Sequence, residues 1–112
     1  MECVFCGIVN KQIAAEIISE EKDFIVISDK YPEAPIHLLF IPKKHFEWSR
    51  DFSKPKLAII AGLIAAAKTI ADKQGISSAY KLVFNAGKAA HFSHIHLHLL
   101  GGWKNNIPKN NI

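Results

Sequence analysis

Long hydrophobic runs are absent from this sequence. The longest uninterrupted apolar stretch is LAIIAGLIAAA, residues 57–67, whereas a helix that spans a bilayer needs about 20 apolar residues. The first residues, MECVFCGIVNKQ, carry an acid and two cysteines where a secretory signal peptide would place basic residues and a long apolar core. We therefore expect no membrane partner and a cytoplasmic location.

Low-complexity tracts, linkers and internal repeats are also missing, and 49% of the 112 residues are hydrophobic. This composition argues against a disordered chain and predicts one compact domain over residues 1–112. The formal net charge of +4 suits an anionic ligand such as a phosphate but does not require one. The lysines are scattered and no basic stripe alternates with aromatic residues, so we expect no nucleic-acid partner.

The order of apolar runs and turn residues predicts an α+β fold. Ser53 can cap a long helix, Pro55 suits its first turn, and Gly75 ends it. A short helix or turn is expected to carry the two cysteines, and the first two β-rich runs read as a hairpin. We expect a mostly antiparallel five-stranded sheet with the long helix on one face. The expected strands lie within residues 15–19, 23–28, 36–42, 80–87 and 94–100.

The histidines are concentrated near the C-terminus, where His94, His96 and His98 alternate with apolar residues. Alternate side chains of a strand share one face, so these imidazoles are expected to form a row. Neighbouring rings on a flat strand converge poorly on one tetrahedral metal ion. A nucleophilic central ring flanked by hydrogen-bond donors suits the transfer of a phosphorus group. A solvated polar face is the alternative. The apolar residues expected to face the core and the long helix are Ile95, Leu97 and Leu99.

Cys3 and Cys6 form a Cys-x2-Cys pair, which is half of a zinc site. A thioredoxin-like redox motif would follow a strand, and no strand precedes this pair. The spacing therefore favours zinc over redox chemistry. The residues alone do not say what completes the site, and two free cysteines in a short helix are the alternative.

The segment HIHLHLL resembles the His-x-His-x-His-x-x signature of the histidine triad (HIT) family of nucleotide hydrolases and transferases. The likeness to that family covers nearly the whole chain and keeps the family's order of segments, which are FCGIVNKQI, DKYPEAPIHLLFIPKKH, NAG and HIHLHLLGGW. The LLGG tail is similar to the branch of nucleotide-binding proteins that hydrolyse adenosine 5′-phosphoramidates. The resemblance implies a HIT-like fold, a purine nucleotide or nucleoside phosphoramidate as ligand, and a homodimer formed by the alanine-rich helix and the YKLVF strand.

The same resemblance implies roles for individual residues. His96 would attack the α-phosphorus to form a covalent nucleotidyl-histidine, His98 would donate to a phosphate oxygen, and His37 would support the triad from the neighbouring strand. No Mg²⁺ requirement is implied, because no acidic cluster lies near the triad. Read without the resemblance, the substrate-binding candidates are equally core or turn residues. These candidates are Phe5, Ile8, Ile13 and Ile27 for the base, Asp29 for the ribose, Asn85 for the phosphate, and Trp103 for the leaving group.

Some bacterial members of the family bind a structural zinc ion through an N-terminal Cys-x2-Cys pair and two histidines. By resemblance the four ligands here would be Cys3, Cys6, His45 and His94. Such a closed site would tie the N-terminal segment to the strand that carries the nucleophile. His94 would then serve the metal site and the triad at once.

The sequence departs from the family before the triad, where Gly-Gln-Ser-Val-x is usual and residues 89–93 read AAHFS. His91 occupies the position of the Ser that contacts the phosphate, and we expect it to take over that contact. The loop from Asn85 to His94 also looks shorter. These departures keep three alternatives open: a dinucleoside polyphosphate hydrolase, a nucleotide-binding or scaffold protein without catalysis, and a zinc-dependent nucleic-acid module.

Overall fold

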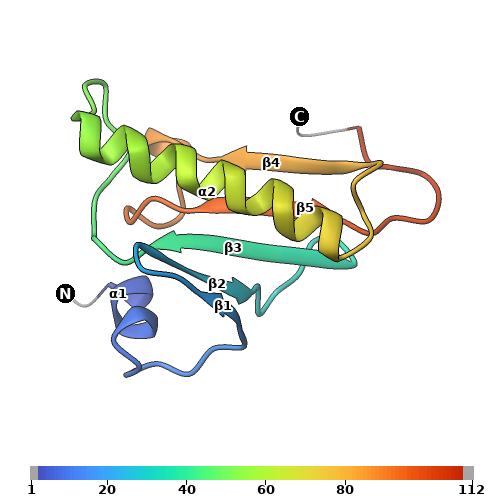
Figure 1. The fold of residues 1–112 in the computed structure, drawn as a ribbon, viewed down its shortest axis with the longest axis horizontal. Coiled ribbons are helices and arrows are strands. Elements are labelled where there is room, and N and C mark those ends of the chain that lie inside the picture. The colour runs from blue at the N-terminus through green and yellow to red at the C-terminus, as the bar shows by residue number, and fades with distance from the viewer. Residues whose placement is uncertain (1–2, 110–112) are drawn as a thin grey trace.

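A computed structural model describes residues 3–109 and shows a five-stranded antiparallel sheet with one long helix laid across it (Figure 1). The strands lie in the order β1-β2-β3-β5-β4, and every neighbouring pair is antiparallel. The α+β prediction is therefore confirmed. The elements are α1 (Val4–Val9), β1 (Ile17–Glu20), β2 (Phe24–Ser28), β3 (Ile36–Pro42), α2 (Lys54–Lys73), β4 (Tyr80–Phe84), a 3₁₀ turn (Gly87–Ala89) and β5 (Leu97–Gly101).

Helix α2 begins and ends where the sequence predicts. The Ser53 side chain accepts a hydrogen bond from the Lys56 N–H, and Pro55 lies in the first turn. Gly75 follows the helix with φ of 75°, a left-handed conformation that favours glycine. The buried face of α2 packs on the sheet, and its small side chains let the helix approach closely. That face comprises Leu63, Ala67 and Ala71, which contact Phe40, Leu97 and Leu99.

Helix α1 covers the opposite face of the sheet. On β2, Val26 belongs to the core packed against α2, whereas its neighbours Ile25 and Ile27 pack with Phe5 and Ile8 of α1. Alternate residues of a strand point to opposite faces, so the two helices lie on opposite sides. The sheet face toward α1 is also the face of the triad, because the Phe5 ring lies 4.8 Å from the His96 ring.

The last strand starts later than predicted. β5 begins at Leu97, so His94 and His96 lie in the segment that leads into it. The ladder with β3 ends at Phe40 and Leu97, and the Ile95 N–H instead donates to the carbonyl of Phe46, 2.8 Å away. The prediction that Leu97 and Leu99 face the long helix is confirmed. Within residues 3–109 no helix combines the length and apolar character needed to cross a membrane.

Candidate functional site

A cavity of about 1330 Å³ opens beside α1 and the loop that follows β2. Its size is ample for a drug-sized or nucleotide-sized ligand. Most of the residues predicted to bind substrate line it, together with two histidines of the triad. These residues are Phe5, Ile8, Ile13, Ile27, Asp29, Asn85, His91, His96 and His98.

The ring of His96 is held in one tautomer. Its Nδ1 lies 2.9 Å from the main-chain carbonyl oxygen of His94, and a carbonyl can only accept a hydrogen bond. Nδ1 therefore carries the proton, and Nε2 keeps its lone pair. Burial lowers the pKa of His96, which favours the neutral ring at physiological pH. A neutral imidazole with a free Nε2 beside a cavity has the form that a nucleophile requires.

The ring of His98 is fixed in the opposite tautomer, through His37. The Glu33 N–H donates to His37 Nδ1 at 3.1 Å, so a neutral His37 carries its proton on Nε2. That atom lies 2.9 Å from His98 Nδ1, which accepts. The proton of His98 is then on Nε2, a buried atom with no hydrogen-bond partner among the described residues. Burial, with smaller effects from His96 and His37, lowers the pKa of His98 to about 4, so this ring is a neutral donor.

Asp29 lies between the cavity and His37. Its Oδ1 accepts a hydrogen bond of 2.8 Å from the Tyr31 N–H, which is the geometry of a turn-forming aspartate. Its Oδ2 lies 3.3 Å from His37 Nε2. The two interpretations of Asp29 from the sequence are therefore compatible, since one oxygen shapes the turn and the residue still lines the cavity.

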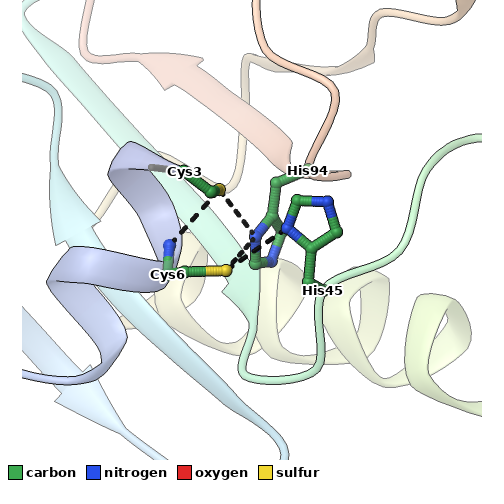
Figure 2. A group of neighbouring side chains, drawn as sticks. All are labelled: Cys3, Cys6, His45 and His94. Carbon is green, nitrogen blue, oxygen red and sulfur yellow. Dashed lines mark hydrogen bonds between the residues drawn. The ribbon is translucent and has the colours of Figure 1, made fainter. Parts of the chain in front are cut away.

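The four predicted metal ligands come together in one cluster (Figure 2). His94 Nδ1 lies 3.4 Å from the Cys3 sulfur and 3.6 Å from the Cys6 sulfur, and His45 Nδ1 lies 3.3 Å from the Cys6 sulfur. In a tetrahedral site with the usual zinc bond lengths, neighbouring sulfur and nitrogen ligands are about 3.6 Å apart. The donor set and its spacing are therefore compatible with zinc.

Hydrogen bonds to main-chain groups orient the side chains of this cluster. His94 Nε2 lies 2.8 Å from the carbonyl of Pro42, so it donates there and Nδ1 keeps a lone pair toward the cysteines. Cys3 caps α1, because its sulfur accepts a hydrogen bond from the Cys6 N–H at 3.4 Å. His45 comes from the loop after β3. The cluster thus links α1, that loop and the segment before β5.

Two aromatic residues depart from what the sequence predicts for the cavity. Trp103 is not among the lining residues of this single chain, and its ring lies 5.9 Å from Lys81 Nζ instead. Phe92 does line the cavity, and its ring contacts those of Phe5 at 5.0 Å and His91 at 4.7 Å. The sequence signal for Phe92 would have been its place beside His91, in the stretch that departs from the family pattern.

The chain is similar to known proteins in both sequence and structure. Residues 2–110 match the family described as "Scavenger mRNA decapping enzyme C-term binding". An uncharacterised HIT-like protein of Chlamydia trachomatis is 38% identical over 104 residues, which cover 91% of this chain and 94% of that protein. A HIT family hydrolase from Legionella pneumophila superposes with a TM-score of 0.87 at 38% identity, over 96% of this chain and 98% of that one.

A zinc-bound histidine triad family protein from Mycobacterium smegmatis superposes with a TM-score of 0.80 at 30% identity. The match covers 95% of this chain and 78% of that chain. The sequence relatives and the solved structures agree with the resemblance carried by the HIHLHLL motif. This chain belongs to the histidine triad (HIT) family.

Proposed function

We propose that this protein is a nucleotide-binding hydrolase of the nucleoside phosphoramidase type, which cleaves purine nucleoside 5′-phosphoramidates, with adenosine preferred. The observation that carries the proposal is the pair of opposed tautomers at one cavity. His96 offers a lone pair and His98 offers an N–H, which are the two functions needed to attack a phosphorus atom and to bind its oxygens. The Legionella relative, which is named a hydrolase, supports this class of activity.

The reaction proceeds in two displacements. His96 Nε2 attacks the α-phosphorus, the phosphorus–nitrogen bond to the amine breaks, and a nucleotidyl-histidine forms. The His94 carbonyl accepts from His96 Nδ1–H and so stabilises the positive charge that develops on the attacking ring. His98 Nε2–H donates to a non-bridging oxygen. Water then attacks the phosphorus, the bond to His96 breaks, and the nucleoside monophosphate is released. The proton that water loses replaces the one that the departing amine took up in the first step.

The remaining lining residues bind the nucleoside. Phe5, Ile8, Ile13 and Ile27 supply an apolar wall for a purine ring, which gains from contact with aromatic and aliphatic side chains. Asp29 accepts from the ribose hydroxyls, and the Asn85 side chain can donate to the phosphate. This assignment supports a nucleotide ligand. The residues near His91 would then contact the amine that leaves.

We assign His91 as the proton donor to the departing amine, because it lines the cavity at the position where the family has a Ser. His91→Ser is expected to slow hydrolysis about 10-fold or more for a basic alkylamine leaving group, and less for a weakly basic aromatic amine. The alkylamide ion is the poorer leaving group, so its departure depends more strongly on a proton donor. The measurement is kcat/KM across a series of amines. An equal effect along the series would contradict the assignment.

We further propose that Cys3, Cys6, His45 and His94 hold a structural zinc ion. The Mycobacterium smegmatis relative, which is described as zinc-bound, supports a zinc ion in this family. A closed four-ligand site supplies a rigid cross-link rather than a reacting group. It would fix α1, which carries the cavity residue Phe5, against the segment that carries His96. No Mg²⁺ is assigned to the reaction.

We also propose a homodimer. Among the strands of residues 3–109, β4 is an edge strand that pairs only with β5. Large apolar side chains stay exposed on β4 and α2: Leu82 at 37%, Leu57 at 50% and Ile64 at 44%. An unpaired edge beside an apolar face favours pairing with a second copy. Trp103, which does not reach the cavity of its own chain, is then assigned to the cavity of the partner.

Ile64→Lys is expected to convert the dimer into a monomer, because it places a charge in the proposed interface. Light scattering coupled to size exclusion gives the mass in solution. Thr69→Lys is the control, since it introduces the same charge on α2 about 140° around the helix. A wild-type chain that is monomeric at micromolar concentrations would contradict the proposed dimer.

Steady-state release of AMP from adenosine 5′-phosphoramidate, without added metal, tests the activity. Diadenosine polyphosphates are assayed beside it. Faster cleavage of the polyphosphates would place the protein with the hydrolases of dinucleoside polyphosphates. AMP binding without turnover of either substrate would indicate a nucleotide-binding protein in which His91 and the altered loop have ended catalysis.

A further inference from the structure

We propose that Asp29 is a positioning residue for the donor His98, and that one carboxylate thereby couples recognition of the sugar to the chemistry at the phosphate. The inference rests on the proposed function and adds a role that sugar binding alone does not include. In this role Asp29 acts through His37, which is 3% exposed and does not line the cavity.

The carboxylate of Asp29 is held firmly in place. The Asp29 N–H donates to the carbonyl of His37 at 2.9 Å, which ties the two residues together across β2 and β3. Oδ1 is occupied by the Tyr31 N–H at 2.8 Å. The remaining oxygen, Oδ2, therefore lies 3.3 Å from His37 Nε2, and the side chain is only 18% exposed.

The nitrogen that carries the His37 proton lies close to two acceptor atoms and donates to one of them. The Glu33 N–H fixes the proton of His37 on Nε2, which donates to His98 Nδ1 at 2.9 Å. The carboxylate oxygen Asp29 Oδ2 lies 3.3 Å from the same nitrogen. When a phosphate oxygen accepts from His98 Nε2–H, positive charge develops along the two rings. A nearby carboxylate in a largely buried setting stabilises that charge and strengthens His98 as a donor.

The sugar acts on the same carboxylate. A ribose hydroxyl that donates to Oδ2 binds the same oxygen that lies 3.3 Å from His37 Nε2, and so holds the carboxylate in place beside the two rings. Binding of the correct sugar then improves the donor at the phosphate, and the interaction appears in kcat as well as in KM. A carboxylate that only bound the sugar would lie apart from His37.

Asp29→Asn separates the two roles, because the amide keeps the shape and an acceptor for the Tyr31 N–H but loses the charge. The variant is assayed with adenosine 5′-phosphoramidate and with its 2′,3′-dideoxy analogue, which lacks both ribose hydroxyls. We expect kcat to fall about 10-fold or more on both substrates. If the penalty disappears on the dideoxy substrate, Asp29 acts through the sugar alone and the proposal is overturned.

A second readout does not depend on turnover. Ring ¹⁵N chemical shifts of the ligand-free wild type should show a protonated Nε2 and a bare Nδ1 on both His37 and His98, and Asp29→Asn should change the shifts of both rings. Asp23→Asn removes the same formal charge from an exposed residue just before β2. It should leave kcat and the ring ¹⁵N shifts of His37 and His98 unchanged. Unaltered His37 and His98 shifts in Asp29→Asn would overturn the proposal, even if the protein hydrolysed no phosphoramidate at all.

Discussion

Replacement of His96 with alanine is expected to reduce phosphoramidate hydrolysis by roughly 10⁴- to 10⁶-fold, the range seen when residues of a nucleophilic catalytic unit are removed. The physical reason is specific to the ring. The His94 carbonyl holds the Nδ1 proton, so Nε2 is a lone pair beside the cavity. Alanine removes the only atom to which the nucleotide would become attached. The measurement is the rate constant for AMP release under single-turnover conditions.

Two comparisons make this result specific. The apolar wall of the cavity is untouched by His96→Ala, so AMP affinity measured by calorimetry should change by less than about 10-fold. His98→Gln removes the preorganised ring donor and leaves a flexible amide N–H near the phosphate. We expect a loss of at most about 10²- to 10³-fold, the cost of removing one preorganised donor. Turnover of His96→Ala within 10-fold of wild type would mean that another group attacks the phosphorus.

Loss of the proposed zinc ion is expected to have the largest effect on stability. Cys6→Ser removes the ligand that lies within 3.6 Å of both His94 Nδ1 and His45 Nδ1. A metal present at about 1,000 times its Kd stabilises a folded chain by about 4 kcal/mol. For a domain of this size that corresponds to a fall in Tm on the order of 10–20 °C. Scanning calorimetry measures the fall in Tm, and elemental analysis measures the loss of bound zinc.

The same variant should also weaken nucleotide binding. Cys3 and Cys6 flank Phe5, whose ring lies 4.8 Å from that of His96 and lines the cavity. Release of the N-terminus of α1 would therefore loosen the wall against which the base packs. Dialysis of the wild type against a chelator should reproduce both effects, and zinc should restore them. A wild-type chain with well below one zinc per molecule and a Tm indifferent to chelator would contradict the zinc site.

Much of the fold follows from local chemistry that the sequence displays. Ser53 and Gly75 mark the ends of α2 because a hydroxyl cap and a left-handed glycine are local requirements. Alternation placed Leu97 and Leu99 toward α2 and the histidines on the other face. β5 begins later than the alternation predicts, because the Phe46 carbonyl accepts from the Ile95 N–H in place of a ladder bond.

The chemistry of the site was less visible from the sequence. Spacing singled out His96 and His98, yet their opposed tautomers depend on the His94 carbonyl and on the Glu33 N–H. Main-chain groups of this kind exist at every residue, so a sequence does not show which of them meets a given ring. The contact between Asp29 and His37 likewise depends on the register of β2 and β3.

Capture of the covalent intermediate is the most direct test of attack by His96. The protein is mixed with adenosine 5′-phosphoramidate, quenched within the first turnover, and digested under conditions that preserve phosphorus–nitrogen bonds. Mass spectrometry then locates any added adenylyl group. We predict one adenylyl group per chain on His96, absent from His96→Ala. Rapid AMP release with no adduct, or an adduct on another residue, would contradict attack by His96.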